Sequence, residues 1–173
     1  RGLLGAAVVL LVAGCAAPPP AAGPITVQIG TTTMGDAGFQ LLSEAGPCEL
    51  LAGYQGLLFL PLRYLATGAS GRVFVTARVE IEGEVPTEQG RTIVLNEEPG
   101  VGFVSETHIV LLDQPIATLI GKSAVITATI TAGAASGTGS IRVVLRDDDP
   151  CIDQGGGTCA LPEAGTADDP DAG

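Results

Sequence analysis

The feature that most constrains the fold is the alternation of apolar and polar side chains along residues 72–82. Successive side chains of an extended strand point to opposite faces, so this period of two predicts a strand with one buried face. Phe74 falls on the polar side, where we expect it to lie over the stem of a long neighbouring side chain. The predicted buried face consists of Val73, Val75, Ala77, Val79 and Ile81.

Other short segments are also typical of strands, and turn residues separate them. Two segments near the C-terminus are predicted to form a hairpin across a Gly- and Ala-rich loop at 132–139. The expected strands besides 72–82 lie at 25–29, 39–42, 57–65, 92–95, 103–112, 124–131 and 140–146.

Proline and glycine mark the expected breaks between these strands. Gly46-Pro47-Cys48 is predicted to be a turn, residues 83–90 a loop, and residues 115–121 a half-turn of helix or an irregular crossover. Pro61 interrupts the apolar segment 57–65. Because proline cannot donate to a strand ladder, we expect a bulge or an edge strand there.

Short strands at roughly ten-residue spacing, with no long helical period, predict an all-β fold. We expect an Ig-like or fibronectin-like antiparallel β-sandwich of about 7–9 strands, with a jelly roll as the alternative. Trp is absent from the chain, so the pairing of a core Trp with two cysteines that marks true Ig domains is missing.

The chain opens on an uncharged run, from Gly2 to Ala17, that is followed by three prolines. This run is shorter than the roughly 20 apolar residues that a membrane-spanning helix needs. Leu3–Val12 instead matches the apolar region of a secretory signal peptide. The sequence Val12-Ala13-Gly14-Cys15 resembles the lipobox of bacterial lipoproteins, which implies cleavage before Cys15 and acylation of that residue. The alternative is an ordinary secreted protein.

The resemblance implies that residues 1–14 are a lipoprotein signal peptide and that residues 15–24 are the lipidated cysteine with a Pro/Ala-rich spacer. Residues 25–151 are the expected sandwich domain, and residues 152–173 an acidic, disordered tail. Several acyl chains hold a protein durably on a membrane. Because Ala16 follows the cysteine where a carboxylate would signal inner-membrane retention, the resemblance favours the outer membrane of the cell envelope.

The chain is strongly acidic, with 8 Lys and Arg against 19 Asp and Glu and a net charge of −11. Binding to phosphate backbones requires an excess of basic side chains, so nucleic acid is excluded as a partner. No cofactor is expected, and zinc is disfavoured because His108 is the only histidine.

Three cysteines remain after Cys15 is assigned to lipid, and an oxidising compartment favours their pairing. Cys151 and Cys159 lie close together, with three glycines between them that allow a small loop to close. We favour this disulfide. A bridge from Cys48 to one of the two is the alternative, and it would constrain more of the unfolded chain.

Part of the domain also resembles uncharacterised predicted lipoproteins of myxobacteria. The resemblance lies in Gly30-Thr31, in Gly38-Phe39-Gln40-Leu41, and in residues 49–56 leading into a strand that contains Arg63. In that group Pro often stands where this chain has Tyr54, and His-Val-Trp stands where it has Leu57-Leu58-Phe59. The group has no known activity to transfer.

The densest acidic cluster, at residues 147–153, offers weak calcium ligands in Asp147, Asp149 and Asp153. Its spacing departs from the helix–loop–helix calcium pattern, because Ile152 stands where that pattern requires glycine. The alternative is that these acids solvate the end of the last strand. Tyr54, ahead of an apolar strand, is a weak candidate for ligand binding; otherwise it belongs to a turn.

His108 could act as a general base with Ser105 or Asp113, but no nucleophile-elbow motif accompanies it, and a histidine in a strand is usually structural. Glu80 and Glu82 could suggest paired-carboxylate glycoside chemistry, yet the alternation places both on a solvated face. We therefore assign no catalytic residue.

The sequence accordingly predicts a membrane-anchored envelope lipoprotein whose β-sandwich is non-enzymatic and serves protein or glycan interaction or envelope structure. A surface-anchored hydrolase and a calcium-binding surface module are the alternatives. The fold predicted here does not identify a ligand, because one fold can carry many different functions.

Overall fold

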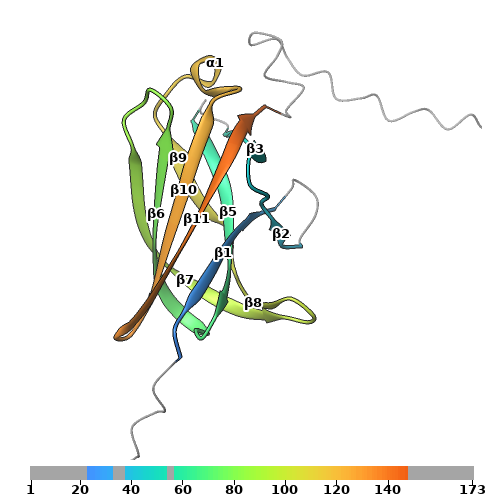
Figure 1. Cartoon of the computed structure of the whole chain (residues 1–173), viewed down its shortest axis with the longest axis vertical. Helices are drawn as coiled ribbons and strands as arrows, with labels where there is room; N and C mark the ends of the chain where they lie inside the picture. The colour runs from blue at the N-terminus through green and yellow to red at the C-terminus, as the bar shows by residue number, and fades with distance from the viewer. Residues whose placement is uncertain (1–22, 33–37, 54–56, 148–173) are drawn as a thin grey trace, which may run out of the picture.

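The computed structural model describes residues 23–32, 38–53 and 57–147 (Figure 1). These residues form an all-β fold with one short helix, as the sequence predicts. The elements are β1 (Thr26–Thr31), β2 (Gln40–Leu41), β3 (Gly46–Glu49), β4 (Leu51–Ala52), β5 (Leu58–Thr67), β6 (Gly71–Ile81), β7 (Thr87–Glu98), β8 (Gly102–Ser105), β9 (His108–Leu112), α1 (Ile116–Leu119), β10 (Ser123–Ala132) and β11 (Ala135–Arg146).

All eleven strands belong to one open, mixed sheet with the order β2-β1-β5-β8-β7-β6-β10-β11-β3. Strands β4 and β9 pair with β5 outside this path. Every pairing is antiparallel except that of β3 with β11, which is parallel. The described part of the chain contains no helix long and apolar enough to cross a lipid bilayer.

The sheet curls so that β1 lies against β11, although the two strands are far apart in the strand order (Figure 1). Two glycines of β11 make this approach possible. A Cβ atom at Gly137 would stand 2.0 Å from the carbonyl oxygen of Ile25, and one at Gly139 would stand 2.2 Å from that of Val27. Any side chain at these positions would therefore collide with the backbone of β1.

The curled sheet encloses one hydrophobic core. The alternating face of β6 is buried as predicted, and it packs in the same cluster as the inner faces of β1, β5, β9, β10 and β11. Burial of a large aliphatic side chain contributes about 1.5–3 kcal/mol, so this cluster is the main source of stability. Its fully buried large members include Tyr64, Leu50, Leu60, Leu62, Ile93, Leu112, Leu119, Ile126, Ile130 and Leu145.

Several local predictions were wrong, mostly because strands include residues beyond the stretch in which apolar and polar side chains alternate. Residues 46–48 belong to strand β3, and the turn lies at residues 44–45, where Ala45 adopts a φ of 55°. Strand β7 includes residues 87–90, which were expected in a loop. The expected strand 103–112 divides into β8 and β9, and the expected strand count of 7–9 becomes eleven.

The predicted hairpin of β10 and β11 is confirmed, but the loop that joins it is much shorter than expected. Ala132 pairs with Ala135, so only residues 133 and 134 form the turn. The glycines of the segment 132–139 therefore serve the contact with β1 as members of the strand. The half-turn of helix expected within residues 115–121 is present as α1.

Pro61 lies in an interior strand, which corrects the expectation of a bulge or an edge. Its carbonyl oxygen accepts a hydrogen bond from the Thr31 hydroxyl at 2.9 Å, so this side of Pro61 faces β1 and β4. The β4 pairing ends at Phe59 and the β1 pairing begins at Leu62, which leaves a gap beside Pro61. The missing N–H points into that gap, because N–H and C=O of one strand residue share a direction.

Phe74 covers a glycine rather than the stem of a long side chain. Its ring lies where a Cβ of Gly90 on strand β7 would stand, at 2.7 Å, and Phe74 is 48% exposed. The glycine allows the ring to lie along the sheet, an arrangement that stabilises glycine positions in strands.

We predict that Gly137→Val destabilises the protein by about 1–3 kcal/mol or more, because the new side chain would push the β1 backbone away from β11. Urea unfolding followed by circular dichroism measures the change. Thr138→Val, at the adjacent exposed position of β11, is the control and should stay within about 0.5 kcal/mol of the parent protein. Equal stability of the two variants would contradict the close approach of β1.

Candidate functional site

Tyr64, Ser105 and His108 form a buried polar cluster where β5, β8 and β9 meet. Their exposed fractions are 0%, 0% and 1%. The Tyr64 hydroxyl and His108 Nδ1 share a hydrogen bond of 2.8 Å, and the two rings stand edge to face with centroids 5.8 Å apart. Ser105 Oγ accepts a hydrogen bond from the Tyr64 backbone N–H at 2.9 Å.

Arg63 extends this cluster toward strand β7. Its Nε donates to the Ser105 carbonyl oxygen at 2.9 Å, and its guanidinium forms an ion pair with Glu98. The side chain therefore links β5, β8 and β7, which are consecutive neighbours in the sheet. Arg63 is nearly buried and Glu98 is half-buried, so loss of Glu98 would leave a poorly solvated positive charge. The pair therefore acts mainly to hold these three strands together.

Burial favours the neutral forms of three core side chains, those of Tyr64, His108 and Cys48. It raises the pKa of Tyr64 above its usual range, and it lowers the pKa of His108, to which the positive charge of Arg91 also contributes. Burial, together with the nearby charge of Glu49, raises the pKa of the Cys48 thiol to about 12. None of these three side chains is both accessible and activated, which are the properties that nucleophilic catalysis requires.

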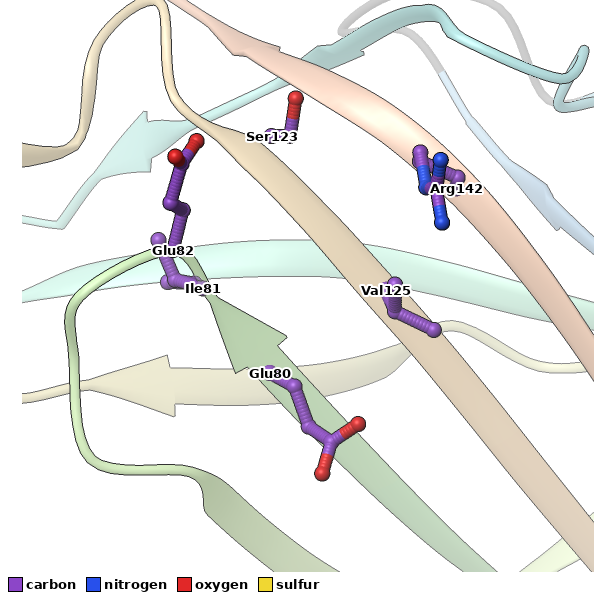
Figure 2. A pocket seen from close by; sticks show the side chains of 6 residues that line it. All are labelled: Glu80, Ile81, Glu82, Ser123, Val125 and Arg142. Carbon is purple, nitrogen blue, oxygen red and sulfur yellow. The ribbon is translucent and has the colours of Figure 1, made fainter.

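A second candidate is an open hollow on the outer face of β6, β10 and β11, with a volume of about 400 Å³ (Figure 2). Val125 forms its floor because it pairs directly with Glu80 on one side and Arg142 on the other. A short side chain between two long charged ones leaves a depression. Ser123, Glu82 and Ile81 complete the lining.

The two long side chains of the hollow differ in their partners. Glu80 is held by Arg78, whose Nε and Nη2 donate hydrogen bonds to Glu80 Oε1 at 3.0 and 2.7 Å. At Arg142 it is the backbone that is held: its N–H donates a hydrogen bond to Glu44 Oε2 at 3.3 Å. Within the described ranges its guanidinium forms no ion pair, so it can meet a ligand.

Most site residues expected from the sequence lie outside the residues that the structure describes: Cys15, Tyr54, Asp149, Cys151, Asp153 and Cys159. Cys48 is described, and it is a buried free thiol of the core. Asp147 is the one calcium candidate in the described ranges. No group of three or more His, Cys, Asp or Glu side chains gathers there to hold a metal ion.

The structure brings together Ser105 and His108, which the sequence offered as possible partners in general-base chemistry, but it joins each of them to Tyr64. Within the described ranges Asp113 forms no hydrogen bond or ion pair with His108, whose ring is hydrogen-bonded to Tyr64. Tyr64 was missed because it stands in a continuous apolar segment, where a single aromatic residue is read as core. Glu80 and Glu82 are exposed, as their place in the alternation predicts.

No family model, curated protein or solved structure matches this chain. The site therefore has to be judged on its geometry. The buried cluster is sealed, and the open hollow is accessible.

We predict that Tyr64→Phe destabilises the protein by about 1–3 kcal/mol, because it leaves His108 Nδ1 buried without its partner. Urea unfolding at pH 7.5 measures the effect. Thr129→Val, which removes a hydroxyl that water reaches, is the control with an expected change of at most about 0.5 kcal/mol. A neutral result for Tyr64→Phe would mean that the hydrogen bond is replaced without cost.

We predict that stability falls as the pH drops below about 6.5, the ordinary pKa of histidine. The lowered pKa of His108 means that the unfolded chain binds a proton more readily than the folded protein. The stability is complete above the unfolded pKa and is lost as the pH falls through the folded pKa, with a slope of at most about 1.4 kcal/mol per pH unit. Urea unfolding of the parent protein and of His108→Gln between pH 7.5 and 4.5 measures this slope. An identical slope in both proteins would exclude His108 as its source.

Proposed function

We propose that this chain is a non-enzymatic binding module, held at the surface of a bacterial envelope membrane by a lipid on Cys15. The observation that carries the proposal is the contrast between the two candidate sites. The chemically versatile side chains Tyr64, Ser105 and His108 are sealed in the core, whereas the polar side chains of the sheet face in Figure 2 are open to solvent.

The order of the strands supports an Ig-like sandwich as the finer description of the fold. In Ig domains the first, second and fifth strands share one sheet, and the third, sixth and seventh share the other. If the short strands are set aside, β1, β5 and β9 are the first, second and fifth strands, and they are neighbours here. The corresponding second group is β6, β10 and β11, which also are neighbours.

The fourth long strand, β7, pairs with β6 as the added strand of variable-type Ig domains does. The positions that an Ig disulfide would bridge lie on the second and sixth strands. In this chain the inner faces of β5 and β10 carry Leu60, Leu62, Ile126 and Ala128. The proposed sandwich is therefore stabilised by aliphatic packing in place of a covalent bridge.

A binding role fits this arrangement better than hydrolysis. A hydrolase needs a nucleophile and a base that substrate can reach, in a pocket that excludes water. The hollow on β6, β10 and β11 is open and holds carboxylates, a hydroxyl and a guanidinium on a flat face. Such a surface recognises a partner by many weak contacts, which suits a module displayed on a membrane.

We predict that Cys15→Ser releases the protein from the membrane fraction of a bacterium that expresses its full precursor. Acylation supplies the binding free energy of the anchor, and a serine cannot carry the thioether-linked lipid. Ultracentrifugation followed by mass spectrometry of the mature N-terminus measures both effects.

Cys159→Ser is the matched control, because it changes a cysteine far from the lipobox and should leave the protein in the membrane fraction. A parent protein that retains residues 1–14 and carries no fatty acid would refute the proposed anchor.

A further inference from the structure

The outer face of β6, β10 and β11 carries hydroxyl side chains in register across the three strands. Thr129 of β10 pairs with Thr76 of β6 and with Thr138 of β11, so three threonines form one row. In the rows on either side, Thr127 pairs with Ser140 and Thr131 pairs with Ser136.

These hydroxyls bond to one another and still keep capacity for a ligand. Thr129 and Thr138 are joined at 2.9 Å, and Thr127 and Ser140 at 3.1 Å. Each hydroxyl has one donor and two acceptor lone pairs. A pair joined by one hydrogen bond therefore retains one donor and three lone pairs, and these lie on the solvent side of the sheet.

The spacing of the rows is regular because strand geometry imposes it. Neighbouring strands lie about 4.7–4.9 Å apart, and rows two residues apart along a strand are separated by about 6.6 Å. The face extends along β6 from Phe74 to Glu80, a stretch of seven residues that spans about 20 Å. This length suits an extended polymer better than a single small molecule.

Phe74 provides an aromatic platform at one end of the hydroxyl rows. It pairs with Thr131, lies over Gly90, and is 48% exposed. A flat exposed ring offers a large apolar surface against which the apolar face of another ring packs. The opposite end of the face is the hollow at Val125, where the Arg142 guanidinium forms no ion pair with any other described residue.

The charges of this face differ from those of the whole chain. Arg72, Arg78, Arg142 and Arg146 stand on the outer side of β6 and β11. Four carboxylates oppose them: Glu80 and Glu82 in the lining of the hollow, Glu88 beside Arg78, and Glu44 at the Arg142 backbone. The face is thus close to neutral in a protein of net charge −11. It neither attracts a polyanion strongly nor repels a neutral partner.

We propose that this face binds an extended, uncharged polysaccharide strand. One sugar ring would stack on Phe74, successive sugar hydroxyls would exchange hydrogen bonds with the threonine and serine rows, and the chain would reach the hollow at Arg142. Sugars combine apolar ring faces with dense hydroxyls, which is the chemistry that the face presents. The inference specifies a ligand class for the proposed binding module and rests on that function.

The test is a pelleting assay with three insoluble uncharged glycans: chitin, cellulose and a β-1,3-glucan. The full chain carrying Cys15→Ser is used, so that the result does not depend on lipidation. We expect the protein to pellet with at least one glycan and to remain bound in about 0.5 M salt, because ionic attraction is screened there.

Two variants test the face itself. Phe74→Ala should weaken binding about five- to tenfold, and Thr129→Val should weaken it about threefold while keeping the shape of the side chain. Ile109→Ala is the matched control, because Ile109 is 45% exposed on β9, outside this face, and should bind as the parent protein does. Thermal unfolding checks that each variant is folded.

Failure to pellet with any of the three glycans would overturn the inference. Binding that salt abolishes, or that Phe74→Ala and Thr129→Val leave unchanged, would overturn it as well. Neither result bears on the anchor, which the membrane fractionation of the acylated protein tests separately.

Discussion

The whole architecture depends on the close approach of two backbones. Strand β1 can lie against β11 because Gly137 and Gly139 have no side chains, and their positions alternate with the exposed Thr138 on the same strand. This contact brings the two ends of one continuous sheet together over a shared core. A sheet that stayed open would expose that apolar surface to water, so the two glycines favour the closed arrangement by allowing β1 and β11 to approach.

The polar residues of the interior also hold strands of this sheet together. Where β7, β8 and β5 adjoin, the side chains form hydrogen bonds with one another or with the backbone; they are Arg63, Tyr64, Ser105 and His108. Buried polar groups are costly unless they are hydrogen-bonded, and a satisfied network favours one arrangement over its competitors. The cluster has the residue types of a catalytic site, but its burial and hydrogen bonds give it a structural role.

The proposed interaction with other molecules is accordingly placed on the surface. On the outer face of β6, β10 and β11 the hydroxyl rows, the ring of Phe74 and Arg142 are arranged by the strand register itself. A lipid on Cys15, as proposed, would present this rigid face outside the cytoplasm without any need for a moving part. The proposed glycan ligand follows from the same register, because the spacing of the hydroxyls is the spacing of the strands.

The sequence by itself determined the elements with clear alternation: the buried face of β6, the exposed Glu80 and Glu82, and the hairpin of β10 and β11. Period-two patterns are local, so a sequence reveals them. Only the tertiary structure decided that residues 46–48 form a parallel strand, that Pro61 faces a gap between two partners, and that Tyr64 meets His108. Each of these depends on a neighbour far along the chain. The residues of a single strand do not reveal its partner, because long-range pairing depends on which distant segments the folded chain brings side by side.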